Sequence, residues 1–424
     1  MKRSRSPKLI SRACLFAAAA LLTVGAPPSA RAANIFFDQN GATAGTGATG
    51  AASFNGAFWV NAVAGTTIPG TVAAAAYTFT NADVAYFIGG SVQTITLASA
   101  TTLNGINDQT GMTFTGSTFT LAGTTPTITV ASGKTTTISS IIAGTAGLTK
   151  ADAGALVLSG VNTYSGTTTL SAGTLRIGNA AALGTSTLSV TGGSLDAASA
   201  LTITNAISLG ANLAFTGTAN LTQTTGAITL TTARTITVDA NTLSLGGVVG
   251  GAFSLTKAGA GTLTLAGTNT YTGGTFLTAG KLSAGVDANL GATAGGLTFN
   301  AGTLLSSGTF STARAVTMTG AGTIEVAASQ TLTMTGVIAG AGALTKAGAG
   351  TLTLSAINTF TGGTTVSAGT LALTSGVALT GTGIIRGNVT VNSGATLDLQ
   401  IANSLGYTAN LKVNGITING GTVK

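Results

Sequence analysis

The chain has 424 residues, of which 63 are glycine, 6% are charged and 44% are hydrophobic. A disordered chain would carry more charge and fewer aliphatic residues, and collagen would show a strict Gly-X-Y period, so the composition excludes both classes. Six of the 17 basic residues lie within the first 32 positions: Lys2, Arg3, Arg5, Lys8, Arg12 and Arg31. The other basic residues nearly balance the nine acids, which argues against nucleic acid as a partner.

The first 32 residues have the pattern of a secretory signal peptide. A basic stretch, MKRSRSPKLISR, precedes the apolar run ACLFAAAALLTVGA, which is shorter than the roughly 20 residues that span a bilayer. The small-x-small pattern Ala30-Arg31-Ala32 follows, and we predict cleavage after Ala32. The mature protein is therefore expected to be exported, passing the periplasm to be secreted or held at the cell surface. No transmembrane segment is expected in it.

Residues 33–125 lack the repeat described below. They contain the sole tryptophan, Trp59, and short alternating runs such as VQTITLA (92–98) and MTFTGSTFTLAG (112–123). Alternation of apolar and polar residues is typical of strands. We predict an N-terminal β-rich segment that begins or caps the fold of the following residues.

A long motif occurs three times after this segment, at 148–175, 255–282 and 344–371. The second copy reads LTKAGAGTLTLAGTNTYTGGTFLTAGKL. A short alternating strand recurs within and around each copy at steps of 20 and 19 residues, as in TLTM (331–334), TLTL (351–354) and TLAL (370–373). A strand that returns every ~20 residues predicts coils that stack and share one core. We therefore predict an all-β fold, a right-handed parallel β-helix (β-solenoid) with roughly 20-residue coils, over residues 126–424.

Twelve positions recur in the motif and are predicted to be structural. The strand leucines, expected in the core, are Leu156, Leu263 and Leu352. The asparagines Asn162, Asn269 and Asn358 each precede an aromatic residue by two positions, and these aromatic residues are Tyr164, Tyr271 and Phe360. Such a pair could form a sugar-binding platform, but we favour a corner asparagine bonded to backbone amides beside an aromatic residue in the core. The recurring lysines Lys150, Lys257 and Lys346 could bind an anionic surface, and we favour solvated lysines in turns.

The three copies resemble the autotransporter-associated β-strand repeat, also called the passenger-associated transport repeat. The likeness rests on the phrase LTKAGAGTLTLAGTNTYTGGT followed by AGKL and on its two relatives. This resemblance implies an exported bacterial passenger of parallel β-helix form, commonly structural or adhesin-like. We expect any translocator barrel to lie outside this chain, because few residues follow the last copy. The resemblance brings no catalytic residues with it.

Side chains that commonly carry catalysis are scarce in the sequence. Histidine is absent and the sole cysteine, Cys14, lies in the predicted signal peptide, so thiol nucleophiles and zinc sites are not expected. The nine acids are dispersed singly: Asp38, Asp83, Asp108, Asp152, Asp196, Asp239, Asp287, Glu325 and Asp398. We predict no catalytic, cofactor-binding or metal-binding residues, no cofactor, and no enzymatic activity.

The favoured function is an exported structural or adhesin-like passenger that forms a β-solenoid rod at the bacterial cell surface. One alternative is a carbohydrate-binding module on a face of the β-helix, and another is a polysaccharide-cleaving enzyme in which coil stacking brings two acids together. The expected partners are a cell-surface polysaccharide or the surface of a host or neighbouring cell.

Overall fold

The computed structural model describes residues 84–87, 94–97, 100–374, 382–409 and 412–424 with their side chains, and strands at 34–37, 52–53 and 59–62 by their backbone. Contacts divide the chain into Met1–Arg31 and Ala32–Lys424, and the second unit contains every described residue. The predicted signal peptide and its cleavage after Ala32 lie outside the described residues.

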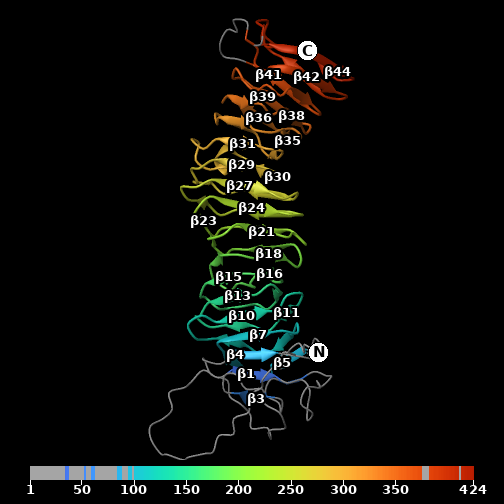
Figure 1. The fold of residues 1–424 in the computed structure, drawn as a ribbon. Helices are drawn as coiled ribbons and strands as arrows, with labels where there is room; N and C mark the ends of the chain where they lie inside the picture. The colour runs from blue at the N-terminus through green and yellow to red at the C-terminus, as the bar shows by residue number, and fades with distance from the viewer. Residues whose placement is uncertain are drawn as a thin grey trace, which may run out of the picture. The chain divides into compact units, whose positions relative to one another are not determined.

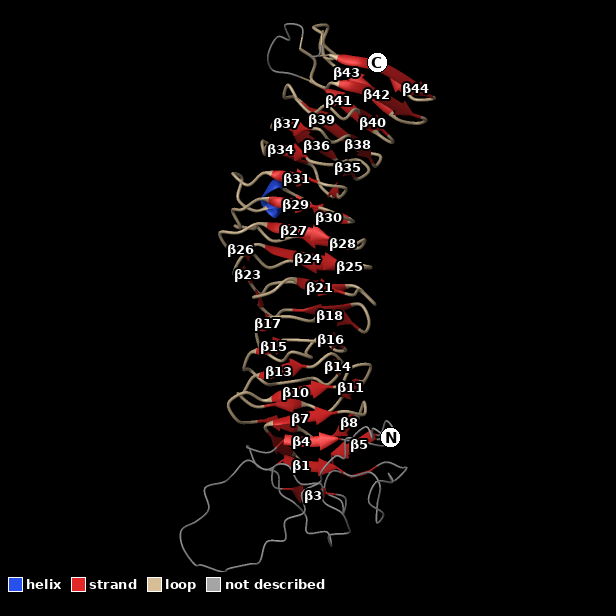
Figure 2. Cartoon of the chain, viewed as in Figure 1, coloured by secondary structure: helices blue, strands red, loops and turns tan. Residues whose placement is uncertain are grey.

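The second unit is a stack of β-coils, as predicted. Figure 2 shows strands throughout, and the one helical turn among the described residues is η1 (Asp287–Leu290). Apart from the antiparallel pair β1–β3, the paired strands listed below run parallel to their neighbours. Figure 1 shows successive strands such as β7, β10 and β13 following one another along the stack in chain order. The prediction of a parallel β-solenoid is confirmed.

The strands form five sheets, named A to E here. Sheet A contains, in spatial order, β3 (Trp59–Ala62), β1 (Asn34–Phe37), β4 (Val84–Phe87), β7 (Gly105–Asp108), β10 (Thr127–Val130), β13 (Leu148–Ala151), β15 (Thr168–Leu170), β17 (Leu188–Val190), β20 (Ile207–Leu209), β23 (Ile228–Leu230) and β26 (Val249–Gly250). Sheet B contains β2 (Ala52–Ser53), β5 (Thr94–Leu97), β8 (Thr113–Gly116), β11 (Thr135–Ile138), β14 (Ala155–Leu158), β16 (Thr174–Ile177), β18 (Ser194–Ala197), β21 (Leu213–Phe215), β24 (Arg234–Val238), β27 (Leu255–Ala258), β29 (Thr275–Leu277), β31 (Leu297–Phe299), β34 (Val316–Met318) and β37 (Ile338–Gly340).

The other three sheets complete the coils. Sheet C contains β6 (Thr101–Leu103), β9 (Phe119–Leu121) and β12 (Ile142–Ala143). Sheet D contains β19 (Leu201–Ile203), β22 (Leu221–Gln223), β25 (Thr242–Leu245), β28 (Thr262–Leu265), β30 (Lys281–Ala284), β32 (Thr303–Ser306), β35 (Gly322–Val326), β38 (Leu344–Ala347), β40 (Thr364–Val366), β42 (Gly387–Asn392) and β44 (Val413–Asn419). Sheet E contains β33 (Phe310–Thr312), β36 (Thr331–Met334), β39 (Thr351–Leu354), β41 (Thr370–Leu373), β43 (Thr396–Leu399) and β45 (Thr422–Val423).

The register of the stack follows the spacing of the alternating strands. Leu352 of β39 pairs with Leu332 of β36 below it and with Leu371 of β41 above it. All three leucines are fully buried, while the threonines that alternate with them are partly exposed. Because side chains of a strand point alternately to its two faces, one row of leucines fills the interior and one row of hydroxyls faces outward. The ~20-residue coil is thereby confirmed.

The three motif copies occupy three different pairs of sheets. The LTKA strand of the first copy, β13, lies in sheet A, that of the second copy, β27, in sheet B, and that of the third, β38, in sheet D. Copies begin 107 and 89 residues apart, and neither spacing is a whole number of ~20-residue coils. Each copy therefore starts about one strand position further around the coil than the copy before it. The motif can form at any of these positions.

The strands of the N-terminal segment continue the same sheets. β4 pairs with β7, and β7 pairs in turn with β10, so sheet A runs without interruption across residue 125, where the sequence suggests a boundary. At its other end, sheet A finishes with β3, which pairs antiparallel with β1. A separate capping role for residues 33–125 stays a prediction.

Candidate functional site: the repeat clasp and the outward threonine columns

The recurring lysines lie inside the solenoid. Lys150, Lys257 and Lys346 are fully buried, and each occupies an inward-facing position of its LTKA strand. The prediction that they are solvated turn lysines is wrong. Alternation within the strand dictates the result, because the leucine two positions earlier faces the core and the lysine must face the same way.

Backbone carbonyl groups satisfy each buried ammonium group. Lys257 Nζ donates to the carbonyl oxygens of Ala258 at 2.6 Å, Gly259 at 2.7 Å and Ala279 at 3.3 Å. Lys150 and Lys346 make the equivalent three bonds, at 2.6–3.2 Å and 2.8–3.0 Å. The third acceptor in each set lies 22 residues further along, in the next coil. An ammonium group has three donors, and here all three are used, so each lysine joins two coils.

Burial lowers the pKa of all three lysines to about 8, and in each case a nearby acid raises it in part. These acids are Asp152 for Lys150, Asp239 for Lys257 and Glu325 for Lys346. Desolvation disfavours the charged form of a buried amine, which explains the direction. At neutral pH the ammonium form still predominates, and the carbonyl groups are suited to it because they can only accept.

A left-handed corner residue presents one of these carbonyl groups. The residue two positions after the lysine has φ of 60° at Asp152, 75° at Gly259 and 72° at Gly348. In the next coil, Gly173 also has positive φ, and a Cβ there would lie 2.2 Å from the Gly154 oxygen and 2.7 Å from Lys150 Nζ. Glycine is therefore required at that corner both by its conformation and by the close approach of the lysine.

The recurring asparagines replace a strand at one corner of the coil. Asn162 Oδ1 accepts from the backbone amide of Ile142 in the coil below, at 2.8 Å, and its Nδ2 donates to the carbonyl of Ala182 in the coil above, at 2.6 Å. Asn269 makes the same two bonds with Val249 and Asn289, at 2.7 and 2.6 Å. The side-chain amide thus supplies the acceptor and the donor that a missing β-strand would have supplied.

Asn358 follows the same pattern in the third copy. Its Oδ1 accepts from the amide of Ile338 at 2.8 Å, and its Nδ2 donates to Ile384 at 3.0 Å. All three asparagines are buried. They are therefore inaccessible as a polar platform for a sugar, whereas their bonds to backbone groups agree with a corner role.

The aromatic residue of each copy lies in the core two positions after the asparagine. Tyr164, Tyr271 and Phe360 are fully buried. Tyr164 Oη lies 2.7 Å from Thr168 Oγ1, and Tyr271 Oη lies 2.7 Å from Thr275 Oγ1. Burial raises the pKa of both tyrosines to about 12, with the hydrogen bonds opposing that rise. We call the inward lysine, asparagine and aromatic residue of one copy, with the threonine four positions after the aromatic residue, a repeat clasp.

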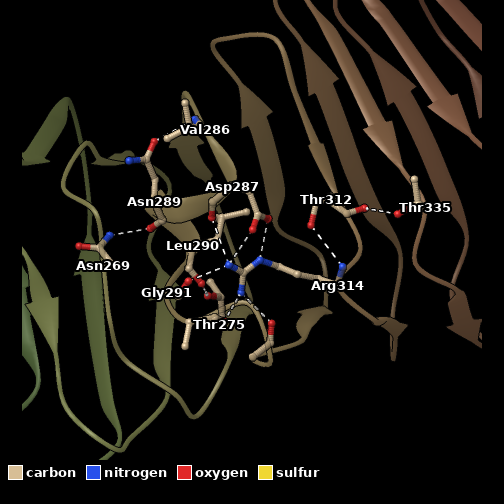
Figure 3. A network of polar contacts seen from close by, with 12 residues as sticks. Asn269, Thr275, Val286, Asp287, Asn289, Leu290, Gly291, Thr312, Arg314 and Thr335 are labelled. Atoms are coloured by element: carbon tan, nitrogen blue, oxygen red, sulfur yellow. Dashed lines mark hydrogen bonds and ion pairs between the residues drawn. The ribbon is translucent and has the colours of Figure 1, made fainter.

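A second buried network supports the clasp of the second copy (Figure 3). Arg314 is 2% exposed, and its guanidinium points into the loop that contains η1. It donates to both carboxylate oxygens of Asp287, at 2.8 and 3.1 Å. It also donates to the carbonyl groups of Ala292 at 2.5 Å, Gly295 at 2.9 Å and Gly291 at 2.7 Å. A planar cation with five donors can fix such a loop from several directions at once.

Sequence reasoning missed two sets of residues in these networks. The threonines Thr168, Thr275 and Thr364 recur four positions after the aromatic residue, so their repetition was visible, but nothing in the letters shows which hydroxyl they face. Arg314 and Asp287 occur outside the motif copies, 27 residues apart, and bear no sequence signal of their pairing.

The outer surface carries columns of hydroxyl groups in register from coil to coil. Thr345 of sheet D pairs with Thr323 below and with Thr365 above. The whole column in sheet D is Thr242, Thr262, Lys281, Thr303, Thr323, Thr345, Thr365, Thr390 and Thr417. A shorter column in sheet E comprises Thr331, Thr351, Thr370, Thr396 and Thr422. From Val326 to Ile385 the one charged residue is Lys346, which is buried, so the described coils in this range present a neutral hydroxyl surface.

The acids of the described region are spread over the coils, and several of them bind neighbouring residues. Buried Asp108 accepts from the amides of Thr110 and Met112 and from the hydroxyl of Thr136. Glu325 pairs with Lys281 at 2.8 Å. Among the residues that the structure describes, no group of three or more potential metal ligands is present, and no helix has the length and apolarity to cross a membrane.

Comparison with known proteins agrees with this geometry. The family model described as passenger-associated-transport-repeat matches residues 148–177, 255–284 and 344–373. Three stretches of the chain are therefore similar to this repeat. Each match begins at the LTKA strand and ends with the strand one coil above the Leu-rich strand, so it spans one repeat clasp with both coils that the lysine joins.

One curated relative matches a larger part of the chain. The chain is 43% identical over 159 residues to the adhesin BmaC autotransporter of Brucella suis biovar 1 (strain 1330). The match covers 37% of this chain and 4% of that protein, so the chain spans a small part of the relative's length. No solved structure matches the chain.

Proposed function

We propose that this chain is an adhesin-like passenger, exported by its N-terminal signal and displayed at the bacterial cell surface. The observation that carries the proposal is the threefold passenger-associated transport repeat within a parallel β-solenoid. The similarity to a protein named as an adhesin autotransporter supports the same role. Residues 1–32 would be the signal peptide, and residues 33–125 would begin or cap the solenoid.

The repeated polar residues lie inside the coils and the threonines lie outside, and this arrangement supports a surface-binding role without catalysis. The lysine and asparagine side chains of the repeat clasps are buried and make their hydrogen bonds inside the solenoid. Binding would then depend on the outward faces, where threonines of sheets D and E recur in register from coil to coil. A neutral hydroxyl surface favours an uncharged, hydroxyl-rich partner, and we propose a polysaccharide on a host or neighbouring cell.

The test combines location with adherence. Intact cells that express the chain are treated with protease, and loss of the full-length band while a periplasmic marker survives would demonstrate surface display. A deletion strain is then compared with the wild type for adherence to polysaccharide-coated and uncoated surfaces. We expect the deletion to lower adherence, whereas a protein resistant to external protease and a deletion without effect would refute the proposal.

A matched pair of variants locates the contact surface. Thr345→Lys with Thr365→Lys places two charges next to each other in the sheet D column. Thr298→Lys with Thr317→Lys does the same on sheet B, where these residues also pair in register. Loss of adherence in the first pair alone would support the sheet D face as the contact surface. Equal effects of both pairs would exclude it.

A further inference from the structure

The three repeat clasps are not equally well bonded. In the first clasp the hydroxyl of Tyr164 contacts Thr168, and Thr168 Oγ1 lies 2.7 Å from Ser186 Oγ. Ser186 Oγ in turn donates to the carbonyl of Leu183 at 2.7 Å. A chain of three hydrogen bonds therefore connects the aromatic residue to the next coil.

The second clasp has a shorter chain of the same kind. Tyr271 contacts Thr275 at 2.7 Å, and Thr275 Oγ1 donates to the carbonyl of Leu290 at 3.3 Å. Leu290 belongs to η1, the turn that Arg314 holds from above through Asp287 and Gly291. The hydroxyl chain again reaches the coil above the clasp.

The third clasp lacks this connection. Phe360 replaces the tyrosine, and Thr364 Oγ1 is buried without a hydrogen-bond partner. A buried hydroxyl without a partner destabilises the state in which it is buried, because it has lost its bonds to water. In this clasp Asn358 also closes a longer stretch of chain, 26 residues to Ile384 instead of the 20 residues spanned by Asn162 and Asn269. Loop-closure entropy changes little over that difference, so the missing hydroxyl is the larger effect.

We propose that, of the three repeat clasps, the third opens first, and that the absent hydroxyl of Phe360 sets this order among them. In stacked repeats each coil contacts only its neighbours, so stability is local and the weakest contact defines a boundary for opening. Coils below Ile338 would stay stacked while those above it separate. This device is independent of the proposed adhesive function, because it concerns the stacking of the coils alone.

The experiment is hydrogen exchange of the purified full chain, read by mass spectrometry on peptides from each clasp. In the wild type we expect the amides of residues 338–373 to exchange faster than those of 249–284 and 142–177. Phe360→Tyr restores the donor that Thr364 lacks, and we expect it to slow exchange around the third clasp by about five- to tenfold, the effect of one hydrogen bond. Tyr271→Phe is the matched opposite change and is expected to speed exchange around the second clasp by a similar factor.

The variants separate the hydroxyl from mere position along the stack. If the third clasp exchanges fastest but Phe360→Tyr leaves its rate unchanged, the order depends on position along the stack and not on the hydroxyl, and the proposal is wrong. Exchange at the third clasp that is no faster than at the second would also overturn it. Because Phe360→Tyr adds a bond, its result decides the question even if Tyr271→Phe does not fold.

Discussion

Replacement of Lys257 by methionine tests whether the hydrogen bonds of the buried ammonium group stabilise the solenoid. Methionine keeps an unbranched apolar stem of similar length but cannot donate to the carbonyl groups of Ala258, Gly259 and Ala279. Those three acceptors would then be buried beside a thioether. Lys134→Met is the matched control, because Lys134 is exposed.

The magnitude follows from two opposing effects. Three hydrogen bonds from a charged donor contribute about 1.5–3 kcal/mol each, or roughly 4.5–9 kcal/mol together. Desolvation of a buried ammonium group costs several kcal/mol, and the lowering of the pKa of Lys257 to about 8 shows the same penalty. Methionine also removes that penalty, but it leaves three buried carbonyl groups without a donor, at a cost of about 1–3 kcal/mol each. We therefore expect Lys257→Met to lower the free energy of unfolding by about 3 kcal/mol overall.

The assay is urea unfolding of the purified full chain followed by circular dichroism, with hydrogen exchange of residues 255–284 as a local readout. We expect the midpoint to fall for Lys257→Met, faster local exchange around the second repeat clasp, and no change for Lys134→Met. A Lys257→Met protein as stable as the control would refute the reasoning, since it would mean that the carbonyl groups gain nothing from the ammonium group.

Three further predictions follow from the same networks. Asn269→Ala removes the acceptor of the Val249 amide and the donor to the Asn289 carbonyl, and should lower the free energy of unfolding by about 2–4 kcal/mol in the same urea assay, more than substitution of an exposed asparagine. Arg314→Met should cost about 3–5 kcal/mol because it leaves the Asp287 carboxylate and four carbonyl groups without their donor, and a thermal midpoint equal to that of the wild type would contradict this. The free energy of unfolding should rise between pH 8 and about 10, by at most about 1.4 kcal/mol per pH unit for each buried lysine. The reason is that lysines with a folded pKa of about 8 and an unfolded pKa near 10.4 release protons on folding in this range. Above pH 10 the buried tyrosines, with a folded pKa of about 12, should reverse the trend, and urea midpoints that fall steadily from pH 8 would disprove the assignment.

The fold was readable from the sequence because the stack repeats one simple constraint. Each of the strands TLTM, TLTL and TLAL places an apolar pair over the pair below it, so the 19- and 20-residue steps around TLTL (351–354) predicted both these strands and their register. The sequence did not predict that the LTKA strands of the three copies lie in three different sheets. This placement follows from the spacings of 107 and 89 residues only when the length of every intervening coil is known.

The positions of the candidate site residues were harder to predict from the sequence than the fold, as the lysines illustrate. A charged residue next to Gly and Ala suggests a turn at the surface, since lysine is rarely buried without a partner. The partners of Lys257 are backbone carbonyl groups, which every residue has and which therefore leave no signal in the sequence. The alternation of Leu255 and Lys257 in one strand was the available signal, and it pointed inward. The asparagine corner was easier, because asparagine beside glycine-rich turns commonly bonds to the backbone.

We infer that the polar residues of the repeats act inside the solenoid, so that any adhesion we propose would depend on the outward faces. Acetylation of the native full chain by an amine-reactive reagent, quantified by mass spectrometry at each lysine, tests it without any mutation. We predict that Lys134, Lys281 and Lys424 are modified readily while Lys150, Lys257 and Lys346 are protected until the protein is unfolded. Equal rates at the two sets in the folded protein would contradict the claim and return the repeat lysines to the surface as candidates for binding.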